Sequence, residues 1–590
     1  MVDKPAKKIS EKFGGSKGMR FGDSPLLGVD LPMWRSKLAV FLMFAAFMGL
    51  IARALYVQCI DTRFFQRQGE IRYQRNLELP ATRGKIMDRN GQVLASSVPA
   101  KAVWVIPEDV KTNDPKLPEL GRLLGMSVAD IKKKLSENKN FVYLKRQVEP
   151  AVADKIAKLD VDGVEQRKEY KRYYPEGETV AHVVGFTNVE DLGQEGMELS
   201  LQSMLAGKTG ARRVIKDRLG HVVEDVTDIV PPQDGRDMTL SIDSKIQFLA
   251  YTHLKNAVDE NRAKAGGIIV LDAKTGEILA LANLPTYNPN QRGQLNGAQL
   301  RNRVLTDTFE PGSTMKPFTV SLALDEHKVT PSTQIQTSPG KLTIGTATIS
   351  DSHAHGILSV AQVIQKSSNI GTAKIALQME PHDMWEMFTE VGFGQAPRIG
   401  FPGAVAGRLR PYKSWKTIEQ VTMSYGYGIS VSLFQLARAY TVFARDGELI
   451  PVSITKTDGP VAGSRVISPE TAKAMRAMLE MVVSPEGTAP KAQIVGYRVG
   501  GKTGTAHKQE GNGYSNKYRG FFVGMAPMSD PRIICAVMID EPSNGKYFGG
   551  DVAAPVFAQV MAGALRALNI TPDAPFKTLV NVEGGVEESM

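Results

Sequence analysis

The chain has 590 residues, 42% of them hydrophobic and 23% charged, with a net charge of +10 and a pI near 9.2. This length predicts two or more domains, and the composition is that of a folded protein. The positive charge allows an anionic partner, but the sequence shows no nucleic-acid motif and no zinc-ligand spacing, which favours a solvated basic surface. Two cysteines, Cys59 and Cys535, exclude a disulfide framework.

The N-terminal region predicts a membrane anchor. Residues 1–37 are polar and rich in lysine, glycine and serine, so we expect a disordered tail. Residues 38–57 are apolar apart from Arg53 and approach the length of a spanning helix, with Trp34 and Tyr56 as interface anchors. A cleaved signal peptide is the alternative, because residues 52–54 have the small-x-small form of a cleavage site. The long polar leader favours an uncleaved anchor, and basic residues on both sides leave its orientation open.

Short elements are predicted between this anchor and a stiff, polar break at residues 231–235. Asn90-Gly91 between apolar runs predicts a tight hairpin, in which both positions accept positive φ. Pro150 opens a predicted helix over 150–159. Apolar spacing predicts another helix over 120–135, whose core candidates are Leu120, Leu123, Leu124, Ile131 and Leu135.

After the break, the pattern predicts an α+β domain. Residues 240–257 suit a helix, and residues 266–284 suit two strands joined by a turn at Lys274-Thr275-Gly276. Helices follow, and strands return late in the chain. This order predicts helices packed on an antiparallel sheet.

A serine and a lysine follow a chain break in this domain. Pro311-Gly312 interrupts the preceding segment, and helical spacing begins near Met315, which puts Ser313 at or just inside a helix N-terminus. Lys316 lies one turn further on, and residues three apart share a helix face, so its amine can lie over the serine oxygen. It can act as a base if burial or a second cation destabilises its ammonium. The motif alone is weak, because the same spacing recurs at Ser136/Lys139, Ser338/Lys341, Ser453/Lys456 and Ser543/Lys546.

Two later motifs could complete this site. Ser367-Ser368-Asn369 precedes a helical pattern, so its hydroxyl and amide could relay a proton and hold a substrate carbonyl, or could simply cap the helix. Lys502-Thr503-Gly504-Thr505 follows an alternating run, as on a strand that can pair with an extended peptide. Lys502 would be the second cation and would attract a carboxylate. The N–H groups of Ser313 and Thr505 could form an oxyanion hole.

The ordered triple of motifs is far more specific than its parts and resembles the penicillin-binding proteins. The resemblance to class B members, and within them to the division-specific transpeptidases, extends from about residue 35 to about residue 575. It rests on the apolar anchor and on further motifs, which are Arg83-Gly84 with Asp88-Arg89-Asn90-Gly91, Phe309 to Thr314, Lys366 to Asn369, Ser424 to Gly428, Tyr547 to Gly550 and Ala554 to Phe557.

This resemblance implies that the protein cross-links peptidoglycan. Ser313 would attack the penultimate D-Ala carbonyl of a stem peptide, and Lys316 would be its base. Ser367 and Asn369 would be the relay and substrate clamp, and Lys502, Thr503, Gly504 and Thr505 would bind the carboxylate end of the substrate. The cleft would be lined by Tyr427, Tyr547 and Phe548. No metal or cofactor is implied.

The resemblance also implies a domain order, a location and partners. The implied domains are a cytoplasmic tail over 1–37, a transmembrane anchor over 38–57, a non-catalytic pedestal of the class B dimerisation type over 58–230, a transpeptidase domain over 236–575 and a tail over 576–590. The chain would cross the inner membrane once, with its catalytic domain in the periplasm. Its partners would be peptidoglycan strands, β-lactams, a membrane glycan polymerase and other division proteins.

Other functions share parts of this pattern. A β-lactamase or penicillin sensor would carry the same three motifs, but the sequence shows no Glu-x-x-Leu-Asn segment to position deacylating water. A non-enzymatic division scaffold is disfavoured because all three motif sites are intact. A plain spacer is the alternative for the pedestal. A sidewall-elongation transpeptidase remains the nearest alternative enzyme.

Overall fold

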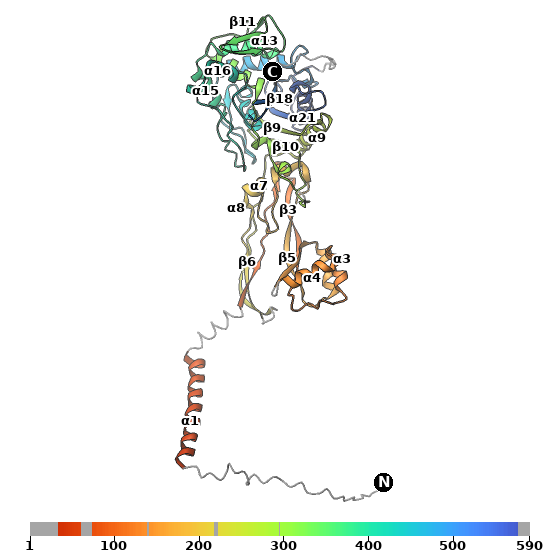
Figure 1. Ribbon diagram of the computed structural model, residues 1–590, viewed down its shortest axis with the longest axis vertical. Helices are drawn as coiled ribbons and strands as arrows, with labels where there is room; N and C mark the ends of the chain where they lie inside the picture. The colour runs from red at the N-terminus through yellow and green to blue at the C-terminus, as the bar shows by residue number, and fades with distance from the viewer. Residues whose placement is uncertain are drawn as a thin grey trace. The chain divides into compact units, whose positions relative to one another are not determined.

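The computed structural model describes residues 33–60, 74–137, 141–216, 222–293, 295–511 and 513–575 (Figure 1). Residues 1–32 of the polar tail predicted over 1–37, and the tail predicted over 576–590, lie outside these ranges. Contacts divide the chain into two compact units, which are described separately. The first comprises Met1–Glu78 and Ala211–Val230, and the second comprises Leu79–Gly210 and Pro231–Met590.

The first unit contains the predicted apolar helix, α1 (Met33–Leu55), which continues as a π-helical turn over Tyr56–Ile60. The segment Met33–Cys59 contains an 18-residue window with a mean hydropathy of 2.2, none of which is buried. By length and composition it can cross a membrane, and it is the one such helix among the described residues. The helix begins five residues before the predicted start. The associated three-stranded sheet has the order β1 (Gln74–Leu79), β6 (Gly210–Lys216) and β7 (Val222–Val230).

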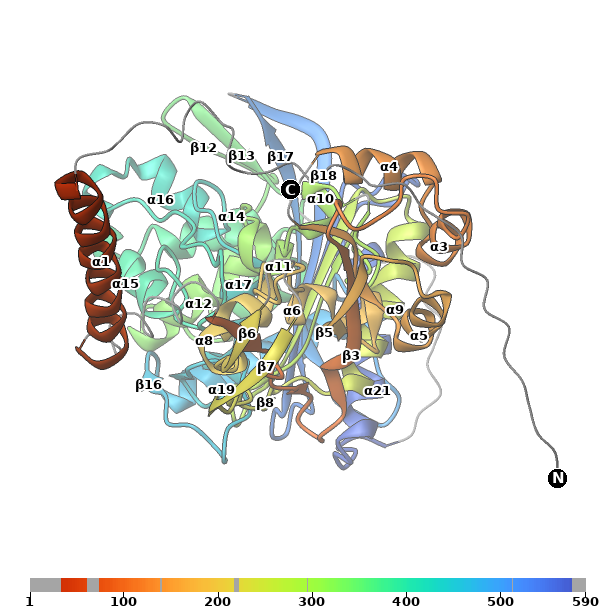
Figure 2. The same ribbon diagram turned by 90° about the horizontal axis from the view of Figure 1, so that it is seen from below.

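The N-terminal part of the second unit is built on a sheet with its own small core. Its strands are β2 (Ile86–Met87), β3 (Val93–Val105), β4 (Val142–Val148), β5 (Val164–Tyr173) and β8 (Met238–Thr239). Figures 1 and 2 both show helices α3 (Leu117–Leu124) and α4 (Val128–Glu137) beside β3 and β5. With α5 (Pro150–Leu159) they enclose a core that includes Val103, Leu120, Leu124 and Ile131.

The predictions for this part hold with two corrections. Helix α5 has the predicted bounds, and Pro150 occupies its first turn, where a missing N–H costs nothing. The helix predicted over 120–135 is two helices, because Gly125 adopts a left-handed conformation (φ 65°) and ends the first. The hairpin at Asn90-Gly91 joins β2 to β3, but Gly91 alone of the two has positive φ, at 88°.

A buried ion triad joins three segments of this part of the unit. Arg83 Nε donates to Glu198 Oε2 at 2.6 Å, and Arg172 Nε donates to Glu198 Oε1 at 2.7 Å, with all three side chains at most 2% exposed. Both carboxylate oxygens are therefore satisfied, as a buried charge requires. The short helices nearby are a 3₁₀ turn at Gly177–Val180, α6 (Ala181–Val184), α7 (Gly196–Ser200) and α8 (Gln202–Leu205).

The C-terminal part of the second unit is an antiparallel five-stranded sheet between layers of helices, as the sequence predicts. The strand order is β10 (Ile278–Leu284), β9 (Ala265–Asp272), β19 (Ile533–Asp540), β18 (Gly513–Ala526) and β17 (Gly500–Glu510). Successive residues of a strand point to opposite faces. A Cβ at Gly266 would meet α9 (Ser244–Glu260), whereas one at Gly267 would meet α11 (Arg303–Thr306) and α17 (Leu433–Ala439), so helices cover both faces.

Two predicted elements of this part are confirmed. The turn at Lys274-Thr275-Gly276 joins β9 to β10. Helix α9 starts four residues after the predicted position, because the Asp243 carboxylate caps it by accepting from the N–H groups of Lys245 and Ile246. Helix α21 (Ala554–Ala567) packs against α9 and the sheet.

The remaining elements carry or surround the motifs. They are α10 (Gly297–Leu300), α12 (Lys316–Asp325), β11 (Gln334–Gln336), β12 (Lys341–Ile344), β13 (Ala347–Ser350), β14 (Ile357–Ser359), α13 (Val360–Lys366), α14 (Asn369–Ala376), α15 (Pro381–Glu390), α16 (Thr417–Ser424), α18 (Thr441–Ala444), β15 (Glu448–Leu449), β16 (Ser464–Arg465), α19 (Pro469–Val483) and α20 (Gly549–Val552). Short 3₁₀ turns cover Gly312–Met315, Tyr412–Ser414 and Pro490–Ala492.

Candidate active site

Ser313 lies in the 3₁₀ turn Gly312–Met315, directly before α12, and is only 4% exposed. This refines the prediction of a helix N-terminus, because the α-helix begins at Lys316. Gly312 has positive φ (54°), and a Cβ there would approach the Thr505 carbonyl oxygen to 3.2 Å. A Cβ at Gly426 would lie 2.2 Å from the Gly312 carbonyl oxygen. The serine turn is therefore fitted closely between β17 and the loop after α16, which only glycines allow.

Lys316 begins α12 and is fully buried. Its Nζ donates to the Ser367 carbonyl oxygen and, at 3.1 Å, to Ser367 Oγ. Pro317 follows within the first turn, where the helix requires no N–H donor. The structure thus joins the first motif to the second through the lysine.

The cap interpretation of Ser367-Ser368-Asn369 is confirmed for Ser368, whereas Ser367 lies against the lysine of the first motif. Ser368 is the N-cap of α14, with its Oγ accepting from the Gly371 N–H at 2.9 Å. Ser367 ends α13 in a left-handed conformation (φ 61°), which directs its carbonyl and hydroxyl oxygens to Lys316. The Asn369 amide donates to the Ser350 carbonyl oxygen at 3.1 Å.

Lys502 brings the third motif to the same hydroxyl. It is fully buried, and its Nζ donates to Ser367 Oγ at 2.9 Å and to the Thr503 carbonyl oxygen at 3.3 Å. Two lysine amines therefore converge on one serine oxygen. Each ammonium raises the cost of keeping the other charged, which is the condition for a lysine to act as a base.

Strand β17 is the last strand in the order of its sheet and carries the rest of the third motif. Thr503 Oγ1 lies 2.8 Å from Thr488 Oγ1, and Thr505 Oγ1 accepts from the Gly549 N–H at 3.1 Å. A Cβ at Gly504 would lie 2.9 Å from Thr314 Cγ2 and 3.0 Å from a carbonyl oxygen, so glycine is required for the serine turn to pack here. An end strand can accept an extended peptide through its backbone groups.

Ring contacts connect the three predicted aromatic residues through others that sequence analysis missed. Tyr427 packs edge-on against Tyr514 at 6.0 Å between ring centroids, and Tyr547 stacks on Tyr518 at 4.3 Å and contacts Phe548 at 4.4 Å. His507 connects these two groups of rings, because its ring centroid lies 6.3 Å from that of Tyr514 and 4.6 Å from that of Tyr518. The chain of rings depends on β17–β18 pairing, so sequence spacing gave no signal for it.

Glu310 is a further residue to which sequence analysis assigned no role. Its Oε1 accepts from the Gly428 N–H at 2.8 Å and from the Tyr514 hydroxyl at 3.2 Å, whereas its Oε2 is buried with no hydrogen-bond partner among the described residues. Burial raises the pKa of this carboxyl group, against a smaller lowering by those hydrogen bonds. Its position three residues before Ser313 was the available signal.

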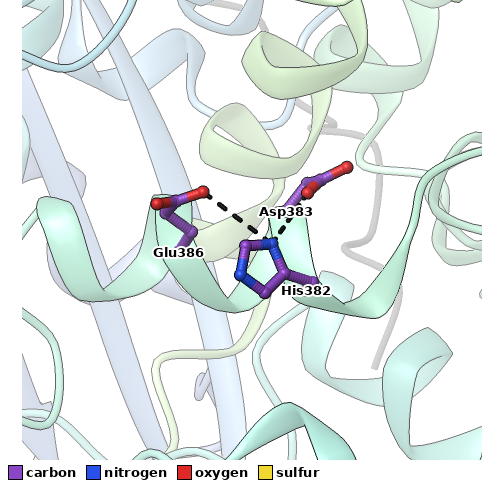
Figure 3. A group of neighbouring side chains, drawn as sticks. All are labelled: His382, Asp383 and Glu386. Atoms are coloured by element: carbon purple, nitrogen blue, oxygen red, sulfur yellow. Dashed lines mark hydrogen bonds and ion pairs between the residues drawn. The ribbon is translucent and has the colours of Figure 1, made fainter.

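Within the described part of the chain, one cluster has the residue types and spacing to hold a metal ion, and it lies on α15. His382 Nδ1 is 3.0 Å from Asp383 Oδ1 and 3.8 Å from Glu386 Oε2 (Figure 3). The side chains are partly or largely exposed, and His382 and Asp383 sit in the first turn of the helix, where the dipole disfavours a cation. The arrangement is a surface histidine–carboxylate contact, and we assign it no function.

Comparisons with known proteins identify two domains in this chain. Residues 266–562 match the penicillin binding protein transpeptidase domain, and residues 78–240 match the penicillin-binding protein dimerisation domain. The probable peptidoglycan D,D-transpeptidase PenA of Neisseria meningitidis is 44% identical over 535 residues, covering 90% of this chain and 92% of the relative. The peptidoglycan D,D-transpeptidase FtsI of Escherichia coli is 40% identical over 549 residues, covering 92% and 93%.

A solved structure is also similar. The transpeptidase domain of penicillin-binding protein 3 from Burkholderia pseudomallei is 59% identical with a TM-score of 0.53, covering 57% of this chain and 98% of that one. The chain therefore belongs to the penicillin-binding proteins that combine a dimerisation domain with a transpeptidase domain.

Proposed function

We propose that this protein is a peptidoglycan D,D-transpeptidase that cross-links stem peptides at the division septum through a serine acyl-enzyme. The observation that carries the proposal is the convergence of buried Lys316 and Lys502 on Ser367 Oγ, beside the turn that bears Ser313. A fold can host many activities, so this local chemistry, and not the architecture, supports the assignment.

The first half of the reaction forms the acyl-enzyme. Lys316 in its neutral form takes the Ser313 proton as the serine oxygen attacks the penultimate D-Ala carbonyl carbon. The N–H groups of Ser313 and Thr505 stabilise the oxyanion. Collapse of the tetrahedral intermediate breaks the peptide bond, and Ser367 relays a proton to the departing D-Ala amine.

The second half transfers the acyl group. The amine of a neighbouring stem attacks the ester carbonyl carbon, loses a proton, and expels Ser313 Oγ, which regains its hydrogen. In this proposal Asn369 holds the donor peptide, while Lys502, Thr503, Gly504 and Thr505 bind its carboxylate end along β17. Tyr427, Tyr547 and Phe548 line the cleft. Lys316 and Ser367 supply the proton transfers that the two steps require.

We further infer the setting of this activity. Helix α1 anchors the chain in the inner membrane, with the N-terminus in the cytoplasm and the catalytic domain in the periplasm, where the substrate lies. Residues 58–230 act as the non-catalytic pedestal and residues 236–575 as the transpeptidase domain. A membrane glycan polymerase supplies strands, and other division proteins bind the pedestal.

Intact-mass spectrometry after exposure to a β-lactam tests the catalytic assignment. The drug mimics acyl-D-Ala-D-Ala, and its tethered leaving amine blocks the acceptor, so wild type should gain one long-lived adduct. Ser313→Ala should gain none. Labelling that persists in Ser313→Ala, or an adduct that clears within seconds as in a β-lactamase, would contradict the proposal.

The septal role has a separate test. Depletion of the protein should produce filaments, because elongation continues when septal cross-linking stops. Round cells would instead assign the enzyme to the sidewall.

A further inference from the structure

The turn that carries Ser367, Ser368 and Asn369 is held by a carboxylate that none of the three motifs contains. Asp351 directly follows β13 and is 9% exposed. Its Oδ2 accepts from Ser368 Oγ at 2.6 Å, and its Oδ1 accepts from the Ile370 N–H at 3.0 Å. Both oxygens of Asp351 therefore bind the segment at the centre of the candidate site.

Ser368 is the middle residue of that segment, so its placement controls both neighbours. Its Oγ caps α14 through the Gly371 N–H, and its hydrogen goes to Asp351. On one side Ser367 adopts its left-handed conformation (φ 61°), which is costly for a residue with a Cβ and persists only when the surroundings impose it. On the other side Asn369 begins the helix.

The carboxylate is itself fixed from the opposite side. The Asp351 N–H donates to the Gly340 carbonyl oxygen at 3.2 Å, and the preceding residue, Ser350, accepts from the Asn369 amide at 3.1 Å. Hydrogen bonds to a charged acceptor are stronger than neutral ones, and a negative charge at the start of α14 is favourable. Asp351 thus links the β12–β13 hairpin to the segment that meets both lysines.

We propose that Asp351 is a positioning residue for the acylation step, acting through Ser368 to aim the Ser367 hydroxyl and the Asn369 amide. The inference rests on the proposed function. In chemical terms, the Asp351 carboxylate fixes the position of Ser367 Oγ, the atom to which both Lys316 and Lys502 donate. Misplacing a proton relay by a fraction of an ångström slows the chemical step more than it weakens substrate binding.

The chain offers a matched control. Asp325, at the opposite end of α12 from Lys316, also binds the start of a serine-capped helix. Its Oδ1 accepts from the Ser468 N–H at 3.0 Å and from Thr471 Oγ1 at 2.8 Å, at the start of α19. Asp325→Asn therefore disturbs an equivalent carboxylate brace away from the three motifs.

The experiment measures acylation of the full chain in detergent by a fluorescent penicillin, resolving the acylation rate constant from the dissociation constant of the first complex. Asp351→Asn and Ser368→Ala should each lower the rate constant about 10- to 100-fold with a smaller change in the dissociation constant. The double variant should be no slower than the slower single variant, because both changes break one connection. Asp325→Asn should acylate like wild type.

Melting temperatures separate positioning from stability. If Asp351→Asn melts lower but acylates like Asp325→Asn, the residue is only structural and the inference is wrong. If Asp351→Asn does not fold, Ser368→Ala alone decides, and wild-type acylation rates in it overturn the inference. If wild type itself forms no adduct, the proposed function fails instead.

Discussion

Lys316 and Lys502 donate to the same atom, Ser367 Oγ, at 3.1 Å and 2.9 Å. A hydroxyl oxygen has two acceptor sites, so these two donors occupy both and leave the Ser367 hydrogen to be donated elsewhere. The two amines can be no further apart than the sum of those distances, in a region where both side chains are fully buried. Ser367 is therefore set up to pass a proton.

This arrangement predicts that Lys502→Ala shifts the pH profile of acylation to higher pH. Removing one positive charge makes it easier for Lys316 to remain protonated, so its basic form appears only at higher pH. The rate at neutral pH should fall at least about tenfold. Stopped-flow acylation across pH 5 to 10 measures the shift. Lys366→Ala is the control, because that lysine adjoins the motif but donates to the Glu486 carbonyl at the surface. An unchanged profile in Lys502→Ala would argue against coupling.

We predict that replacing Glu310 by glutamine increases the stability of the fold at high pH but not at low pH. Burial raises the pKa of its carboxyl group above the ordinary 4.5, so its stabilising effect is complete below that pH and is lost as pH rises through the folded-state pKa. Glu310→Gln should therefore raise the melting temperature at pH 8, and the gain should vanish near pH 4. Exposed Glu486→Gln serves as the reference. A variant less stable than wild type at pH 8 would show that the ionised carboxylate is needed.

We predict that His182 makes the stability of the fold decrease in acid. Burial lowers the pKa of its imidazole to about 4 from 6.5, and its Nε2 lies 2.7 Å from the Gln299 carbonyl oxygen. Its neutral form stabilises the fold fully above pH 6.5. As pH falls toward 4, the unfolded chain binds a proton that the folded chain does not, at a cost of about 3 kcal/mol.

Thermal unfolding between pH 4 and pH 7.5 tests this. His182→Asn should be less stable at pH 7.5 but should lose less stability on acidification than wild type. Exposed His327→Asn should keep the wild-type slope. Equal slopes for all three proteins would remove His182 as the cause.

We predict that signal peptidase does not remove the N-terminal segment that contains α1. Its apolar residues continue past residues 52–54, where a signal peptidase could cut, into the turn at Tyr56–Ile60. N-terminal sequencing of the protein extracted from membranes should find the residues that precede α1. A mature chain starting near Leu55 would instead identify a signal peptide.

Local chemistry determined several elements from the sequence alone. These elements are the start of α5 at Pro150, the glycine turn between β9 and β10, and the apolar helix α1. Each depends on a few neighbouring residues, so the sequence pattern was enough to predict it. The break at Gly125 was also local, but the apolar spacing on either side of it suggested one continuous helix. Three short motifs in a fixed order were specific enough to indicate the serine chemistry.

Contacts between segments that are distant in the sequence were decided only by the tertiary structure. Two lysines from different elements donate to Ser367, and Asp351 accepts from Ser368. Glu310 is buried by residues from other parts of the chain. The sequence marks which residues can donate, accept or ionise. Which partner each one meets, and whether water is excluded there, follows only from packing, because hydrogen bonds and desolvation act over a few ångströms in space whatever the separation along the chain.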